Sequence, residues 1–411
     1  MSRKVKVVIA CFAVLALLAT LGLGCAEEKE GEEGKVVITI GNITDITGPA
    51  GPSTKPVTWG WEDTVNYINE EDPIPGVEIR IITYDCRYDP SRDIPGYEWC
   101  KDRGAKVIYT PMPTTTAAVK VLAGRDKLPI ITATASEAVV EPPGWVFAFV
   151  PTSISRIKSL LEWISAEDWD YSQGKPTIGS AGWYEPYHLD IARGVEEYCE
   201  AHSDKFEYVG SFLTPMGTVT WGGEVERLKD CDYIAIPETS LAPATFITEL
   251  RSKGYTAPKL IGTDTLSGFK GLLVDKCGWE SLDGMLNDYV QLWWSDPVPT
   301  MDLIKDILDR YHSTAEAQEL IDSGNSYSFA VSSALFYLGI LREAIENVGA
   351  ENFNGQAYYE TAISYETTLE GFATAGYTES IRWAIKHHRV YEWSSEARDL
   401  VRLSEWQPLV E

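Results

Sequence analysis

The sequence lacks the short motifs that mark the common classes of enzyme. It contains no G-x-S-x-G nucleophile elbow, no Walker phosphate-binding loop and no H-E-x-x-H zinc motif. Its five histidines lack the spacing of metal ligands, because the neighbours His387 and His388 would point to opposite faces of a strand. We therefore expect a protein that is not an enzyme and needs no metal or other cofactor.

Positive charge and cysteine are also scarce. Lysine and arginine number 35 against 61 acidic residues, a formal charge of −26, so the phosphate backbone of a nucleic acid would be repelled. None of the seven cysteines forms a C-x-x-C pair, which argues against a zinc or redox site. Cys86 and Cys100 are the best candidates for a disulfide, since they are close in sequence and flank one predicted helix. The alternative, that all cysteines after Cys25 are reduced, carries equal weight.

The N-terminus has a basic start and an apolar run that ends at Cys25. Arg3, Lys4 and Lys6 precede this run, which is the pattern of an export signal. The stretch resembles a bacterial lipoprotein signal, in which the cysteine is acylated and becomes the first mature residue, although Gly22 replaces the usual leucine. We expect residues 1–24 to be the signal peptide, Cys25 to carry the lipid and residues 25–35 to be a disordered acidic linker. The alternative is a retained membrane-spanning anchor.

From residue 36 onward, short apolar runs alternate with helical patterns. This rhythm predicts parallel sheets with helices on both faces, and the length favours two doubly wound sheets in tandem. Helices dominate the later part, and residues 380–393 alternate like a strand. The predicted strands are 35–44, 77–85, 105–110, 127–136, 145–153, 176–182, 206–213, 232–238 and 258–264.

Several segments resemble, in order and spacing, the leucine/isoleucine/valine-binding-protein family, the type I periplasmic binding proteins that feed ABC importers. Two departures are the proline-containing "DPIPG" in place of a glycine pair, and His188 in place of a glycine. The segments that carry the resemblance are "DITGPAG", "PIPGVEIRIITYD", "DCRYDP", "LPIITATAS", "WYEPYHLDIARG" and "ELRSKGYTAPKLIGTD".

The resemblance implies an α/β fold of two doubly wound parallel-sheet lobes joined by a three-strand hinge. The chain would cross between the lobes near residues 150–153, 283–290 and 371–380. Lobe 1 would then comprise residues 36–152 and 287–373, and lobe 2 residues 153–286 and 374–411.

A ligand in such a fold lies at the carboxyl ends of the strands. The hydroxyls of Thr114 and Thr115, at a helix start, can hold a carboxylate there, or can simply cap the helix. The resemblance assigns the ligand's carboxylate and amine to the loop of Thr134, Ala135 and Ser136. It also implies that the ring of Tyr187 covers the ligand and that Asp264 binds an α-ammonium group. Further candidates nearby are Trp183, Glu238 and Thr239. Alternatively, the aromatic residues Tyr187 and Trp183 belong to the core, and Asp264 forms an Asx turn.

The resemblance thus implies a lipid-anchored, extracytoplasmic binding protein of an ABC importer. Its lobes would close on an amino acid (branched-chain or related), an amide, or an aromatic or other small acid, and the closed form would dock on a membrane permease. We expect a monomer. A receptor module of the same fold that senses ligand without transport is the alternative, and an exported enzyme is a third.

Overall fold

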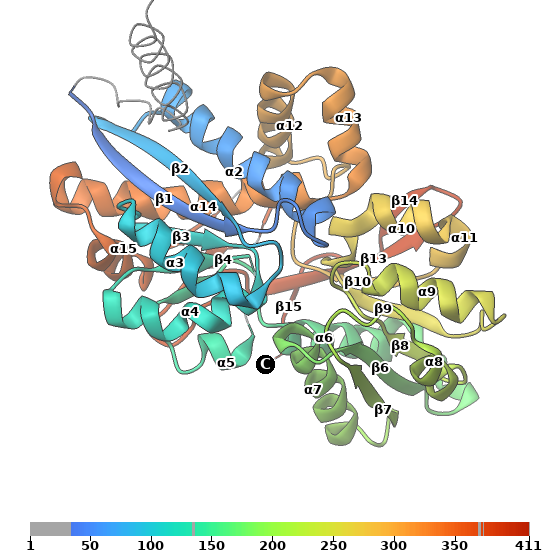
Figure 1. Cartoon of the computed structure of the whole chain (residues 1–411). Helices are drawn as coiled ribbons and strands as arrows, with labels where there is room; N and C mark the ends of the chain where they lie inside the picture. The colour runs from blue at the N-terminus through green and yellow to red at the C-terminus, as the bar shows by residue number, and fades with distance from the viewer. Residues whose placement is uncertain (1–33, 134–135, 369–370, 373, 411) are drawn as a thin grey trace, which may run out of the picture.

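The computed structural model describes residues 34–133, 136–368, 371–372 and 374–410. The predicted signal peptide and Cys25 lie outside the described residues. The described chain forms two α/β lobes side by side, one built mainly from the first third of the sequence and the other from the middle (Figure 1). The predicted fold class is confirmed.

The first lobe contains a five-stranded, wholly parallel sheet in the order β2-β1-β3-β4-β5. Its inner strands are apolar and rich in β-branched residues because helices cover both faces, so neither face meets water. The strands are β1 (Val36–Thr44), β2 (Val77–Asp85), β3 (Val107–Thr110), β4 (Ile130–Thr132) and β5 (Val146–Ala148).

Helices from both ends of the sequence cover this sheet. α14 lies along α2, although about 270 residues separate them, and α14 is the one described helix long and apolar enough to span a membrane. Of its most apolar window, 78% is buried inside the protein, as in a core helix of a globular fold. The helices are α2 (Gly51–Glu71), α3 (Asp93–Asp102), α4 (Pro113–Asp126), α5 (Glu137–Val140), α12 (Pro299–Tyr311), α13 (Thr314–Ser323), α14 (Ser326–Val348) and α15 (Gly355–Ala362).

The second lobe repeats the same strand order, β7-β6-β8-β9-β10, in parallel, and then adds antiparallel strands. The strands are β6 (Thr177–Trp183), β7 (Glu207–Thr214), β8 (Tyr233–Ala235), β9 (Lys259–Thr263), β10 (Leu286–Tyr289), β13 (His387–Ser394), β14 (Asp399–Arg402) and β15 (Gln407–Pro408). Its helices are α6 (Ser153–Trp163), α7 (Pro186–Ala201), α8 (Gly222–Leu228), α9 (Ala242–Ser252), α10 (Lys270–Cys277) and α11 (Trp279–Leu282).

The chain passes between the lobes after β5, after β10 and before β13. Before the third passage it forms the small hairpin β11 (Glu366–Thr367) and β12 (Ala375–Gly376), and Trp383 then pairs with Ala148 beside the first passage. Whereas the sequence analysis set a lobe boundary between residues 286 and 287, β10 pairs with β9 and β13 inside the second sheet. This strand has only four residues, of which Asn287 and Asp288 are polar, so it left no separate signal in the sequence.

The candidate disulfide between Cys86 and Cys100 is not formed, and both thiols are buried and free. A Cβ added at Gly41, in the middle of β1, would lie 2.8 Å from the Cys100 sulfur. Cys86 instead follows the end of β2, where its N–H bonds the carbonyl of Thr44 at the end of β1. Three residues of strand, about 10 Å, separate these two contacts, more than a disulfide spans.

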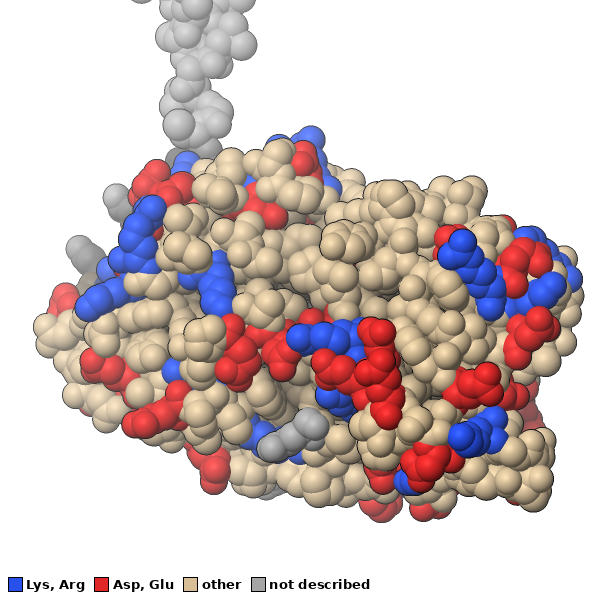
Figure 2. All heavy atoms as spheres, turned by 90° about the horizontal axis from the view of Figure 1, so that it is seen from below, with Lys and Arg blue, Asp and Glu red and all other residues tan. Residues whose placement is uncertain are grey.

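The surface carries acidic and basic side chains in small mixed groups on the face in Figure 2. Uncharged residues separate these groups on that face. The excess of acid in the composition is therefore not concentrated there in one single-sign patch.

Candidate ligand-binding cleft

Each lobe has a topological switch point, where the chain leaves neighbouring strands in opposite directions. In the order 2-1-3-4-5 this point lies between the first and third strands, β1 and β3 in one lobe and β6 and β8 in the other. The loops at the carboxyl ends of such strands diverge and leave a crevice, which is where open α/β sheets bind ligands. The residues after β1, β3, β8 and β9 border one shared cavity here.

The cavity has a volume of about 120 Å³. Its wall combines apolar side chains with hydroxyls and amides. The first lobe contributes Ala50, Ser53, Thr54, Val57, Tyr88, Pro111, Met112, Pro113, Ala133, Val150, Asn325, Ser326 and Phe329; the second contributes Arg156, Tyr187, Thr239, Ser240, Asp264, Thr265, Gly268 and Phe269, and Gln291 follows β10.

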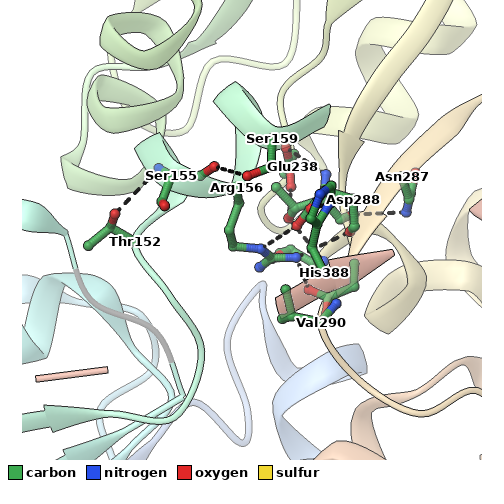
Figure 3. A network of polar contacts seen from close by, with 12 residues as sticks. Thr152, Ser155, Arg156, Ser159, Glu238, Asn287, Asp288, Val290 and His388 are labelled. Atoms are coloured by element: carbon green, nitrogen blue, oxygen red, sulfur yellow. Dashed lines mark hydrogen bonds and ion pairs between the residues drawn. The ribbon is translucent and has the colours of Figure 1, made fainter. Parts of the chain in front are cut away.

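A buried cluster of charges forms part of the second lobe's wall, with Arg156 at its centre (Figure 3). Arg156, in the first turn of α6, donates Nη2–H to Asp264 Oδ1 at 2.6 Å and Nε–H to Asp288 Oδ2 at 2.8 Å. Behind it, His388 Nδ1 lies 2.9 Å from Asp288 Oδ1. Burial raises the pKa of the Asp264 carboxyl, and the positive charge of Arg156 opposes that rise.

A second buried network holds the ring of Tyr187. Its hydroxyl donates to Glu238 Oε2 at 2.9 Å and lies 2.6 Å from Thr263 Oγ1. Thr263 in turn donates its N–H and its hydroxyl to the two Glu238 oxygens. Burial raises the pKa of Glu238, and the hydroxyl of Thr263 and the charge of Arg156 lower it. The network fixes Tyr187 at the start of α7, against the cavity.

The cavity brings together only some of the residues expected at the site. Tyr187, Thr239 and Asp264 line it. Thr134 and Ala135 lie outside the described residues. The other expected residues, which do not border the cavity, are Thr114, Thr115, Ser136, Trp183 and Glu238.

Three of these residues have internal roles. The Thr115 hydroxyl donates to Asp93 Oδ1 at 2.6 Å in a fully buried contact. The indole of Trp183 donates to the carbonyl of Thr218 at 2.8 Å. Glu238 is wholly buried behind Tyr187.

The sequence analysis missed Arg156 and Gln291. Arg156 precedes Ser159 and Leu160 by three and four residues, so it shares a helix face with residues that are buried. An arginine on an apolar face was therefore a usable signal that a buried acid lies opposite. Gln291 offered no signal, because it stands in an irregular segment after a short strand.

The two lobes also touch across the mouth of the cleft. The Glu137 N–H, at the start of α5, donates to Asp190 Oδ2 of α7 at 2.7 Å, and Arg193 pairs with the Glu137 carboxylate. Nearby, the Ser240 hydroxyl donates to the carbonyl of Pro49 at 3.2 Å. These contacts join elements of different lobes, so separation of the lobes would break them.

Comparison with known proteins agrees with this architecture. The family model described as periplasmic binding protein matches residues 37–393, so the chain belongs to this family. Membership of the family implies an extracytoplasmic protein that binds a small solute. A comparison with curated protein sequences gives no match.

Solved structures similar to this chain share its fold at low identity. A branched-chain amino acid ABC transporter from Thermus thermophilus with bound valine has a TM-score of 0.78 at 16% identity, over 91% of this chain and 97% of that one. An R. palustris solute-binding protein in complex with 4-hydroxybenzoate gives 0.75 at 16%, over 91% and 97%. A fatty acid ABC transporter substrate-binding protein from Thermomonospora curvata gives 0.74 at 14%, over 92% and 95%.

Proposed function

We propose that this chain is the ligand-binding component of an ABC importer, and that its lobes close around one small molecule in the cavity between them. The observation that carries the proposal is the position of the cavity, where the switch points of both sheets meet. A ligand there contacts both lobes at once. Its binding energy therefore favours the closed arrangement by the difference in affinity between closed and open forms.

The similar solved structures support transport, since they are described as ABC transporter proteins. Their ligands range from valine to 4-hydroxybenzoate, so they support a small organic ligand without fixing its class. In this reading the closed form docks on a membrane permease as a monomer. Tyr187, Thr239 and Asp264 contact the ligand, and the lipid on Cys25 keeps the protein beside the membrane.

A thermal-shift screen of single compounds tests the binding site. Amino acids, small carboxamides and benzoates form the panel, and a compound at a hundred times its dissociation constant should stabilise the chain by about 2.7 kcal/mol. Val57→Trp, which fills the cavity from α2, should abolish that shift. Val121→Trp is the matched control, because Val121 is 79% exposed on α4.

Small-angle scattering then tests closure. The radius of gyration should be smaller with the stabilising compound than without it, and deletion of the gene should abolish uptake of that compound. A stabilising compound that still shifts Val57→Trp, or one that leaves the scattering curve unchanged, contradicts the proposal. Cys25→Ser should release the protein from the membrane fraction; retention there would favour the anchor alternative.

A further inference from the structure

The charged side chains that line the described part of the cavity are Arg156 and Asp264, and they form an ion pair whose guanidinium also pairs with Asp288. Their contacting atoms are 2.6 Å apart, and the side chains are 1% and 2% exposed. The second oxygen of Asp264 accepts the N–H of Val290 at 3.3 Å. Neither residue is therefore a vacant counter-ion for a charged ligand.

The first lobe offers no charge to a ligand. Its contribution to the wall consists of apolar side chains, hydroxyls and one amide. Hydroxyls there already have partners, since Thr54 donates to backbone carbonyls and Ser53 lies 2.9 Å from Ser326 Oγ. A carboxylate or an ammonium group facing this side would lose its hydration and gain no ion pair.

Two polar side-chain atoms of described residues in the wall lack a hydrogen-bond partner, Thr239 Oγ1 and Gln291 Oε1. Gln291 Oε1 is buried and has no hydrogen bond, although buried acceptors in folded proteins are nearly always satisfied. A ligand N–H or O–H group that reaches Gln291 Oε1 would supply the missing hydrogen bond. On the other side, Arg156 uses Nε and Nη2 in its ion pairs, and Nη1 has no hydrogen bond to any described residue, so it can donate to a carbonyl.

Full charges on the ligand would be unfavourable beside this pair. A ligand carboxylate that reaches Arg156 lies next to Asp264, and an ammonium group that reaches Asp264 lies next to Arg156. A zwitterion must give up the hydration of both its ions, at several kcal/mol each, to meet groups that are already paired with one another. An uncharged group with one donor and one acceptor avoids these costs.

The size of the cavity limits the ligand further. A 150 Å³ apolar cavity in another protein binds benzene, which has six heavy atoms. At about 120 Å³, this cavity suits a molecule of similar size or one that is slightly smaller.

We propose that the cavity selects a compact, uncharged carboxamide whose N–H bonds Gln291 Oε1 and whose carbonyl accepts a hydrogen bond from Arg156, and that it discriminates against free amino acids. The inference rests on the proposed function, because it concerns the ligand class of the same cleft. The rest of the ligand packs against the apolar wall.

Titration calorimetry on the full-length chain with four matched compounds tests the inference. Isobutyramide carries both hydrogen-bonding groups, 3-methyl-2-butanone lacks the donor, isobutyrate carries a negative charge and valine carries both charges. We expect isobutyramide to bind roughly tenfold or more tightly than each of the other three. Equal or tighter binding of valine or isobutyrate overturns the inference, and so does the absence of binding by all four.

A substitution separates the hydrogen bond from general packing. Gln291→Leu should weaken isobutyramide binding roughly five- to tenfold and leave 3-methyl-2-butanone unchanged. Gln318→Leu, at an exposed position on α13, is the matched control. Unchanged isobutyramide affinity in Gln291→Leu also overturns the inference. Should valine bind and compact the protein in scattering, the proposed function would stand while the ligand class would be refuted.

Discussion

Asp93→Asn should stabilise the protein at neutral pH but not at acid pH. Asp93 begins α3, is 1% exposed and accepts a hydrogen bond from Thr115 on one oxygen. Its other oxygen is buried without a partner. Burial raises the pKa of this carboxyl from 3.8 to about 6, against the opposing effect of the Thr115 hydroxyl.

The magnitude follows from the linkage between protonation and folding. The folded state holds the proton more tightly than the unfolded state, so ionisation costs nothing below pH 4. The cost grows as the pH rises from 4 to 6 and is complete above pH 6. A difference of about two pKa units corresponds to about 3 kcal/mol. Asparagine is neutral at every pH and still accepts the Thr115 hydrogen bond.

Urea unfolding followed by tryptophan fluorescence at pH 4, 5, 6 and 7 measures this effect. The gain in unfolding free energy for Asp93→Asn should be close to zero at pH 4 and approach about 3 kcal/mol at pH 7. Asp102→Asn, at an exposed position on the same helix, should show no such trend. A gain that does not depend on pH, or a loss at pH 7, would refute the reasoning.

Three further predictions concern the charges and thiols. Arg156→Met should lower the unfolding free energy by about 3–5 kcal/mol in urea, because it leaves Asp264 and Asp288 buried without their cation; a loss below 1 kcal/mol would show that the cluster is hydrated. Burial raises the pKa of Asp190 to about 6 in the arrangement in which it accepts the Glu137 N–H across the cleft. Protonation of Asp190 therefore favours this closed arrangement of the lobes over the open one proposed above. The radius of gyration without ligand should therefore fall between pH 7 and pH 5, and Asp190→Asn should remove that change; an unaltered pH response in the variant would exclude this carboxyl as its source. Alkylation of the unfolded chain without reductant should modify both Cys86 and Cys100, as seen by peptide mass spectrometry, and an unmodified pair joined by a disulfide would contradict the structure.

The sequence predicted the sheet framework well because the signal there is local. A strand buried on both faces must be largely apolar, as β9 is, and its observed bounds match the predicted run closely. The edge strand β2 is only half-buried, yet its bounds also match the predicted run. Order and spacing of the motifs then indicated the family, which the family model confirms. The sequence analysis did not predict the short strand β10, because four residues carry too little pattern to separate a strand from a loop.

The wall of the cavity depended on contacts that no local pattern contains. The sequence placed Thr115 and Asp264 at helix and strand ends, where ligand groups are commonly bound, and both do lie near those ends. Only the folded chain brings Asp93 onto Thr115 and Arg156, more than a hundred residues away, onto Asp264. The physical reason is that a buried acid takes whichever partner the packing supplies. The alternation of residues along the chain thus determined which strands and helices form, whereas tertiary packing decided which polar groups remain free for a ligand.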